Sequence, residues 1–419
     1  MSTIYPYASG RLLHERNTYF YSAFHGQATF DAWLSARAGA QDAPPPPHDA
    51  TPTRQRLSGP LDTATLDKLV QRFEVTKRLH DDYLPSWRAV DTTRFEDMKS
   101  YRLFADRLAG AYERTGQLWY LNTLLKVNDT LTALGHLPKD GRVAEQRLIR
   151  ALAERVALPP LRPFAPVPWQ AAPAPARVIP GLSAILCASA RARAYIQRLV
   201  MLGLIPEYVL FLGEDGPAAL PSGPQNWDGV FLPDLSEPAT ATCARAGIPV
   251  TRIAAPDVND PAVRDVLRRQ GGGVTLYAGL GGQIVSKETL ECGVRFLHLH
   301  SGSLPEYRGS TTLYYALLNG QAPAVSAIWL DPQIDTGPVL ARQSYPIPAS
   351  GMDVDRLYDA SIRADLMGRI VGEIARHGAD HLTPQPTEGP EGVYYVIHPI
   401  LKHIALMALS GTRAQISAP

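Results

Sequence analysis

The spacing of hydrophobic positions changes along the chain. Between residues 61 and 157 apolar residues recur at i, i+3, i+4 and i+7, beginning with Leu66, Leu69, Val70 and Phe73. This is the period of a helix face packed on a core, so we predict an α-helical N-terminal domain over residues 1–158. Pro44 to Pro47 should form an exposed extended loop within it, because consecutive prolines fix the backbone and remove its donors. We find no catalytic pattern in this domain.

A Pro-rich segment, residues 159–176, follows and is predicted to be an extended linker. Beyond it, short apolar runs alternate with segments of helical spacing. This alternation predicts an α/β domain with a mainly parallel sheet over residues 177–345, and a C-terminal extension over residues 346–419. The predicted strands are 178–189, 208–213, 248–254, 274–279, 294–300 and 325–331. Helices are predicted in segment 191–206, which ends in a Gly-x-x-Pro stop, at 241–246, and in segment 261–273, which ends in a glycine-rich stop.

Composition narrows the class of protein. Lys and Arg total 41 against 40 Asp and Glu, and this near-neutral balance argues against a protein that binds nucleic acid by neutralising phosphates. The three cysteines form no Cys-x-x-Cys pair, which excludes a disulfide scaffold. Charged residues stand where a signal peptide needs an apolar core, and no apolar run is long enough to span a membrane. We therefore expect a cytoplasmic protein that does not bind membranes.

The candidate catalytic side chains lie where predicted strands end. His298 and His300 lie two residues apart at the end of strand 294–300, so both imidazoles should lie on one face at the ligand-binding edge of the sheet. A structured loop with Gly302, Pro305 and Gly309 follows. Asp335 lies in a turn after the next strand. Imidazoles and a carboxylate are the groups needed to transfer an acyl group to an amine, since they stabilise an oxyanion and move a proton.

Two motifs carry a family resemblance. HSGSLPEYRG (300–309) resembles the HxSLLPxxRG signature of the 10-formyltetrahydrofolate-dependent formyltransferases. WLDPQIDTGPVL (329–340) is similar to that family's second motif, in which an Asp-Thr-Gly turn supplies the catalytic carboxylate. The resemblance implies a Rossmann-like formyltransferase domain in which His300 and Asp335 are catalytic. Two motifs at this separation are more specific than either alone.

The resemblance also implies 10-formyltetrahydrofolate as the formyl donor, with no metal. The loop YAGLGGQIVSKETL (277–290) occupies the position where the family's backbone contacts the folate ring. The residues expected to line the folate pocket are Leu280, Gly281, Gly282, Gln283 and Ile284.

Three positions depart from the family pattern. His298 stands where the family has asparagine. An imidazole N–H can still donate to an oxyanion, so we include His298 among the catalytic residues, and a titratable ring can also carry a proton. Gly302 and Ser303 replace Ser-Leu, a change expected to affect only loop packing.

The expected acceptor is the amine of a small molecule, such as an amino sugar, an amino acid derivative or a secondary metabolite. A tRNA acceptor is not expected, given the neutral charge and the roughly 75 residues after the second motif. The N-terminal domain should shape the acceptor pocket or mediate a homodimer. Two alternatives stay open: a metal-dependent amide or ester hydrolase that uses the His-x-His pair, and a non-catalytic folate-type binding module.

Overall fold

The computed structural model describes residues 142–153 and, with short gaps, residues 175–389, together with single residues or short stretches at 106–128 and 393–409. The chain divides into two compact units. One comprises residues 1–160, 317–320 and 394–419, and the other residues 161–316 and 321–393. The predicted proline loop at 44–47 and nearly all of the predicted linker lie outside the described residues.

The first unit is helical wherever residues 106–128 and 143–153 are described. Its longest described helix is α7 (Val143–Ala153), which buries Leu148 and Ile149. Glu145 is buried on α7 and accepts a hydrogen bond of 2.6 Å from Asn128 and one of 2.8 Å from Arg142. The helical spacing read from the sequence is therefore present in this part of the chain, whereas the domain boundaries stay a prediction.

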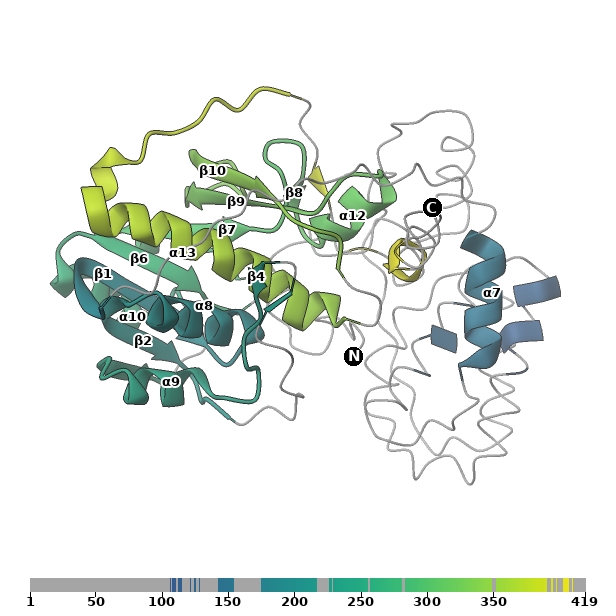
Figure 1. Cartoon of the computed structure of the whole chain (residues 1–419), viewed down its shortest axis with the longest axis horizontal. Coiled ribbons are helices and arrows are strands. Elements are labelled where there is room, and N and C mark those ends of the chain that lie inside the picture. Colours follow the sequence, from purple (N-terminus) through teal and green to yellow (C-terminus); the bar gives the residue numbers. More distant parts are fainter. Residues whose placement is uncertain are drawn as a thin grey trace. The chain divides into compact units, whose positions relative to one another are not determined.

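The second unit contains a seven-stranded sheet in the order β10-β9-β7-β6-β1-β2-β5 (Figure 1). Strands β5, β2, β1, β6 and β7 are parallel, whereas β9 runs antiparallel to β7, and β10 antiparallel to β9. The predicted α/β class with a mainly parallel sheet is confirmed. The strands are β1 (Arg177–Cys187), β2 (Leu204–Leu212), β5 (Val250–Ile253), β6 (Val274–Ala278), β7 (Arg295–His300), β9 (Ala324–Trp329) and β10 (Val339–Ser344).

Local sequence signals explain most helix boundaries. Ser189 caps α8 and Asp260 caps α10, each by accepting a backbone N–H of the first turn. Gly271 ends α10 in the left-handed conformation at φ 68°. The Gly-x-x-Pro stop expected after the helical spacing of residues 191–202 is present, because Gly203 turns the chain at φ 68°. The strand predicted at 208–213 begins earlier, at Leu204. The helices are α8 (Ala190–Met201), α9 (Ala239–Arg245), α10 (Pro261–Gln270), α11 (Lys287–Leu290), α12 (Thr312–Leu318), α13 (Asp359–His377), a π-helical turn (Val354–Tyr358) and a 3-10 turn (Ala379–His381).

Helices cover both faces of the sheet. On one face α13 packs against α8 and against β7 and β9 (Figure 1). On the other, Val263 and Leu267 of α10 join a buried cluster with side chains from β1, β2, β6 and β7, including Leu210 and Phe296. Four two-residue strands complete the description: β3 (Asn226–Trp227), β4 (Val230–Phe231), β8 (Arg308–Gly309) and β11 (Val393–Tyr394).

Helix α13 was not among the predicted helices, although its apolar residues have helical spacing. Ile362, Leu366, Ile370 and Ile374 are all buried on one side of this helix. None of the described helices is both long and apolar enough to cross a membrane.

Candidate active site

The two histidines come from the end of β7. In the antiparallel register His298 lies opposite Ile328 and His300 opposite Ser326 of β9. Because they are two residues apart in a strand, both rings project from one face, as expected from the sequence. The pairing of β7 with β6 ends at Leu297, so both histidines lie beyond the last paired residue of these two strands.

Asp335 comes from the turn between β9 and β10, and the neighbouring residues explain its conformation. Asp331 accepts the hydroxyl of Thr336 at 2.8 Å, which folds the turn back on itself. A Cβ on Gly337 would lie 1.8 Å from the carbonyl oxygen of Trp329, so only glycine fits there. Asp335 itself has φ 53°, in the left-handed region that aspartate tolerates better than most residues.

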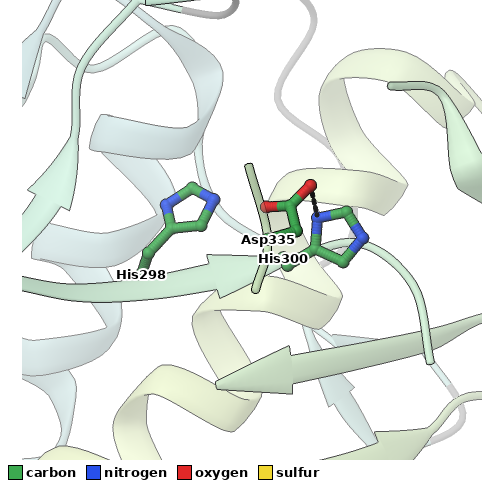
Figure 2. Close-up of side chains that lie close together, drawn as sticks. All are labelled: His298, His300 and Asp335. Carbon is green, nitrogen blue, oxygen red and sulfur yellow. Dashed lines mark ion pairs between the residues drawn. The ribbon is translucent and has the colours of Figure 1, made fainter. Parts of the chain in front are cut away.

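The structure brings His298, His300 and Asp335 together. One polar atom from each lies within 4.8 Å of those of the other two. His300 Nδ1 is 3.3 Å from Asp335 Oδ2, and the carboxylate lies between the two imidazole rings (Figure 2). The convergence of strand end and remote turn that the sequence predicted is thus present.

The hydrogen bonds of His300 fix which nitrogen faces the site. Its Nε2 lies 2.6 Å from the carbonyl oxygen of Tyr307 and must donate, because a carbonyl only accepts. Nδ1 is therefore the only ring nitrogen left to face Asp335 and a substrate. When Nδ1 also carries hydrogen, the ring and the carboxylate form an ion pair.

Gly302 makes this arrangement possible. A Cβ at this position would lie 2.7 Å from the carbonyl oxygen of Tyr307 and 2.8 Å from His300 Nε2, the two atoms of that hydrogen bond. The expectation that Gly302 affects only loop packing was too weak, because the glycine lies directly against the histidine ring. Ser326 helps hold the same loop by donating to the Gly302 carbonyl at 2.7 Å and accepting from Leu304 N–H at 3.1 Å.

The Asp335 carboxyl is held in its charged form. Burial alone would raise its pKa, but the charge of His300 and the hydrogen bond from that ring outweigh burial and hold the pKa well below its usual value. The N–H of Gly309 adds a hydrogen bond of 2.9 Å to Oδ2. A carboxylate fixed in this way can orient an imidazole and receive a proton through it.

His298 has a different environment. Burial lowers its pKa well below the usual value, and the positive charges of Arg191 and Arg363 lower it further. Its Nδ1 is buried without a hydrogen-bond partner among the described residues. The ring centroid of Tyr277 lies 6.1 Å away. His298 is thus a neutral imidazole with an unused polar atom beside the catalytic pair.

The predicted folate loop follows β6 at the same sheet edge. Asn259 holds it by donating to the carbonyl of Ile284 at 2.9 Å and accepting from the N–H of Ser286 at 2.7 Å. Leu280 is 38 % exposed, one of four large apolar side chains exposed among the residues that the structure describes. Gln283 is partly buried, and Gly281 and Gly282 lie outside the described residues.

Sequence reasoning missed four residues that shape the site. Tyr307 and Asn259 act through backbone or amide contacts that no motif marks. Arg191 and Arg363 come from α8 and α13, far from β7 in sequence, and each is one of several charged residues on its helix, so no sequence signal marks it.

A mainly parallel α/β sheet with an imidazole–carboxylate pair at its carboxyl edge is typical of an enzyme active site that moves protons. Residues 219–366 match the family model described as formyl transferase, and this part of the chain is a formyl transferase domain.

Curated relatives agree with this assignment. The chain is 31 % identical over 153 residues to a methionyl-tRNA formyltransferase of Moorella thermoacetica, an alignment that covers 35 % of this chain and 48 % of that protein. It is 32 % identical over 192 residues to the methionyl-tRNA formyltransferase of Halorhodospira halophila, covering 38 % of this chain and 61 % of the relative. The chain thus spans about half the length of the curated relatives it matches.

Solved structures include distant neighbours. A sugar N-formyltransferase from a Shewanella species aligns at 13 % identity with a TM-score of 0.36, over 54 % of this chain and 87 % of that one. An N-formyltransferase from Helicobacter canadensis, in complex with folinic acid and dTDP-3-aminofucose, aligns at 15 % identity with a TM-score of 0.37, over 55 % of this chain and 80 % of that one. The family assignment depends on the sequence matches and not on these alignments.

Proposed function

We propose that the protein transfers a formyl group from 10-formyltetrahydrofolate to the amine of a small molecule. The observation that carries the proposal is the His300–Asp335 pair, which lies beside His298 at the carboxyl edge of the sheet inside a formyl transferase domain. In the reaction the acceptor nitrogen bonds to the formyl carbon, the bond from that carbon to N10 of the folate breaks, and the proton lost by the amine ends on N10.

The side chains divide this chemistry between them. A ring nitrogen of His298 donates to the oxygen of the formyl group while it carries negative charge, and His300, with its hydrogen on Nε2, has Nδ1 available to accept a proton. Asp335 keeps the His300 ring oriented and compensates its charge. His300 with Asp335 then takes the proton from the acceptor nitrogen and passes it to the leaving nitrogen.

The loop after β6 is proposed to bind the folate ring. Its backbone is fixed at Ile284 and Ser286 by Asn259, so its carbonyl and N–H groups are presented in a set geometry. The exposed Leu280 offers an apolar surface for a flat ring, which supports its proposed place in the pocket with Gly281, Gly282, Gln283 and Ile284.

A small acceptor is favoured by the charge of the chain. With a net charge of +1, the protein has little excess positive charge to hold a polyanion such as tRNA. The curated relatives nevertheless carry the name methionyl-tRNA formyltransferase, so methionyl-tRNA belongs among the acceptors to be tested. A cytoplasmic location would supply both substrates and is part of the same proposal.

A metal-dependent hydrolase is less well supported. The three side chains offer ligand atoms close enough together to suggest a cation. Two guanidinium groups, those of Arg191 and Arg363, act on His298 strongly enough to lower its pKa, and the same positive charges oppose a divalent cation. Metal analysis of the purified protein separates the two functions.

The test is incubation of the purified protein with 10-formyltetrahydrofolate and a panel of amines that includes amino sugars, amino acids and methionyl-tRNA. Release of tetrahydrofolate together with a product 28 Da heavier, the mass of the formyl group less one hydrogen, identifies the acceptor. Turnover with methionyl-tRNA alone would contradict the small-molecule acceptor, and no turnover with any amine would contradict formyl transfer.

A further inference from the structure

Arg363 of α13 contacts the strand segment that carries the two site histidines. Its guanidinium donates to the carbonyl oxygen of Leu299, the residue between the two site histidines. The same guanidinium contacts the carboxylate of Asp359, one helical turn earlier, with Nε 2.9 Å from Oδ2. One planar group thus links the first turn of α13 to the end of β7.

The strand geometry explains why Leu299 needs this partner. The carbonyl of Phe296 accepts from Leu330 N–H on the β9 side of the strand. Because carbonyls alternate along a strand, the carbonyl of Leu299 points to the opposite side, toward β6. The pairing with β6 ends at Leu297, so Leu299 lies beyond the last paired residue, and Arg363 donates to its carbonyl.

We propose that Arg363, anchored by Asp359, is a positioning residue that fixes the His298–Leu299–His300 segment for formyl transfer. The proposal rests on the proposed function and extends it to a residue outside both sequence motifs. Helix α13 then has a role beyond covering the sheet, because its first turn holds the two imidazoles in place.

The charge of Arg363 has a second effect on the site. Together with burial and Arg191, it favours the neutral form of the His298 ring. A protonated His298 would compete with His300 for the Asp335 carboxylate that lies between the rings. The charged or titratable groups that act on His298 come from α8, α13, the β9–β10 turn, β7 and β6: Arg191, Arg363, Asp335, His300 and Tyr277.

The same helix provides a matched control. Arg369 pairs with Asp365 at the same i,i+4 spacing, and its side chain is 19 % exposed against 15 % for Arg363. Arg369 also donates to Gln343 at 3.2 Å, on β10 and away from the histidines. Replacing either arginine therefore removes one guanidinium–carboxylate pair of α13, and Arg363 is the one of the two that donates to the carbonyl of Leu299 on β7.

The experiment compares Arg363→Met, Arg363→Lys and Arg369→Met. We expect kcat to fall about 10- to 100-fold in Arg363→Met, as expected for a small displacement of catalytic groups, with KM for the formyl donor changed less than about threefold. Removing the positive charge makes His298 easier to protonate, so the acid limb of the kcat profile should move to higher pH. Arg363→Lys should keep the charge and the limb but still lose kcat, because an ammonium lacks the planar fork.

Arg369→Met should keep kcat within about twofold and leave the pH profile unchanged. A wild-type kcat and acid limb in Arg363→Met, or an equal loss in Arg369→Met, would overturn the positioning role. A parallel NMR titration follows the His298 ring, assigned by its absence in His298→Asn. It should show a raised pKa in Arg363→Met only, and it needs no turnover, so it separates failure of this inference from failure of the proposed function.

Discussion

Gly302→Ala is the substitution whose effect the structure specifies in most detail. The added Cβ would lie 2.8 Å from His300 Nε2, and ordinary contact begins at 3.4 Å, so the ring must move by about 0.6 Å or the loop must shift. The Tyr307 carbonyl, at 2.7 Å, is backbone and cannot rotate away. Overpacking of this kind costs about 1–3 kcal/mol, which corresponds to a fall in Tm of roughly 2–12 °C for a domain of this size.

The loss of activity should exceed the loss of stability. The displaced atom belongs to the hydrogen bond that orients His300, and a shift of catalytic groups below 1 Å lowers kcat by about 10- to 100-fold. Thermal unfolding and a steady-state assay of formyl transfer measure the two effects. Gly216→Ala is the control, since a Cβ there meets nothing within 4 Å. Wild-type kcat in Gly302→Ala would refute the reasoning that this glycine holds His300 in place.

Three further predictions follow from the same geometry. His300→Ala and Asp335→Ala should each lower kcat by about two to four orders of magnitude, and the double variant should be little worse than either, as steady-state kinetics would show. His298→Asn should keep part of the activity if His298 only donates a hydrogen bond, whereas complete loss in the same assay would indicate a titrating role. Because folding lowers the pKa of His298 below 6.5, its contribution to stability is present above that pH and lost as the pH falls. The free energy of unfolding in urea should therefore differ less between pH 8 and pH 5 in His298→Asn than in the wild type.

The site could be predicted from the sequence because its three side chains stand in or next to two short, recognisable motifs. His298 and His300 are two residues apart in one strand, and the glycine and proline pattern after them marks a tight loop. Asp335 was predicted from the Asp-Thr-Gly turn. The structure shows why this turn needs Gly337: a Cβ there would clash with the carbonyl oxygen of Trp329. Alternating strands and helices were sufficient to predict the sheet, because parallel strands need crossover helices.

The residues that support the site could not be predicted in the same way. Arg363 reaches Leu299 across 64 positions of sequence, and its role depends on where β6 stops pairing with β7. Tyr307 contributes a carbonyl, which every residue has, so its identity carries no signal. Helix α13 had a visible apolar period, but it follows the last motif and was assigned to an extension. The strand predicted at 208–213 begins earlier, at Leu204, directly after Gly203 turns the chain.

The most direct test compares the wild type with Asp335→Asn, using 10-formyltetrahydrofolate and the acceptor found in the amine panel. Asparagine keeps the size of the side chain and can still accept from Gly309, but it removes the charge that pairs with His300. We predict equal release of tetrahydrofolate and formylated amine by the wild type, and a rate lower by about two to four orders of magnitude in a folded Asp335→Asn protein. An unchanged rate in that variant would contradict the central role of the His300–Asp335 pair.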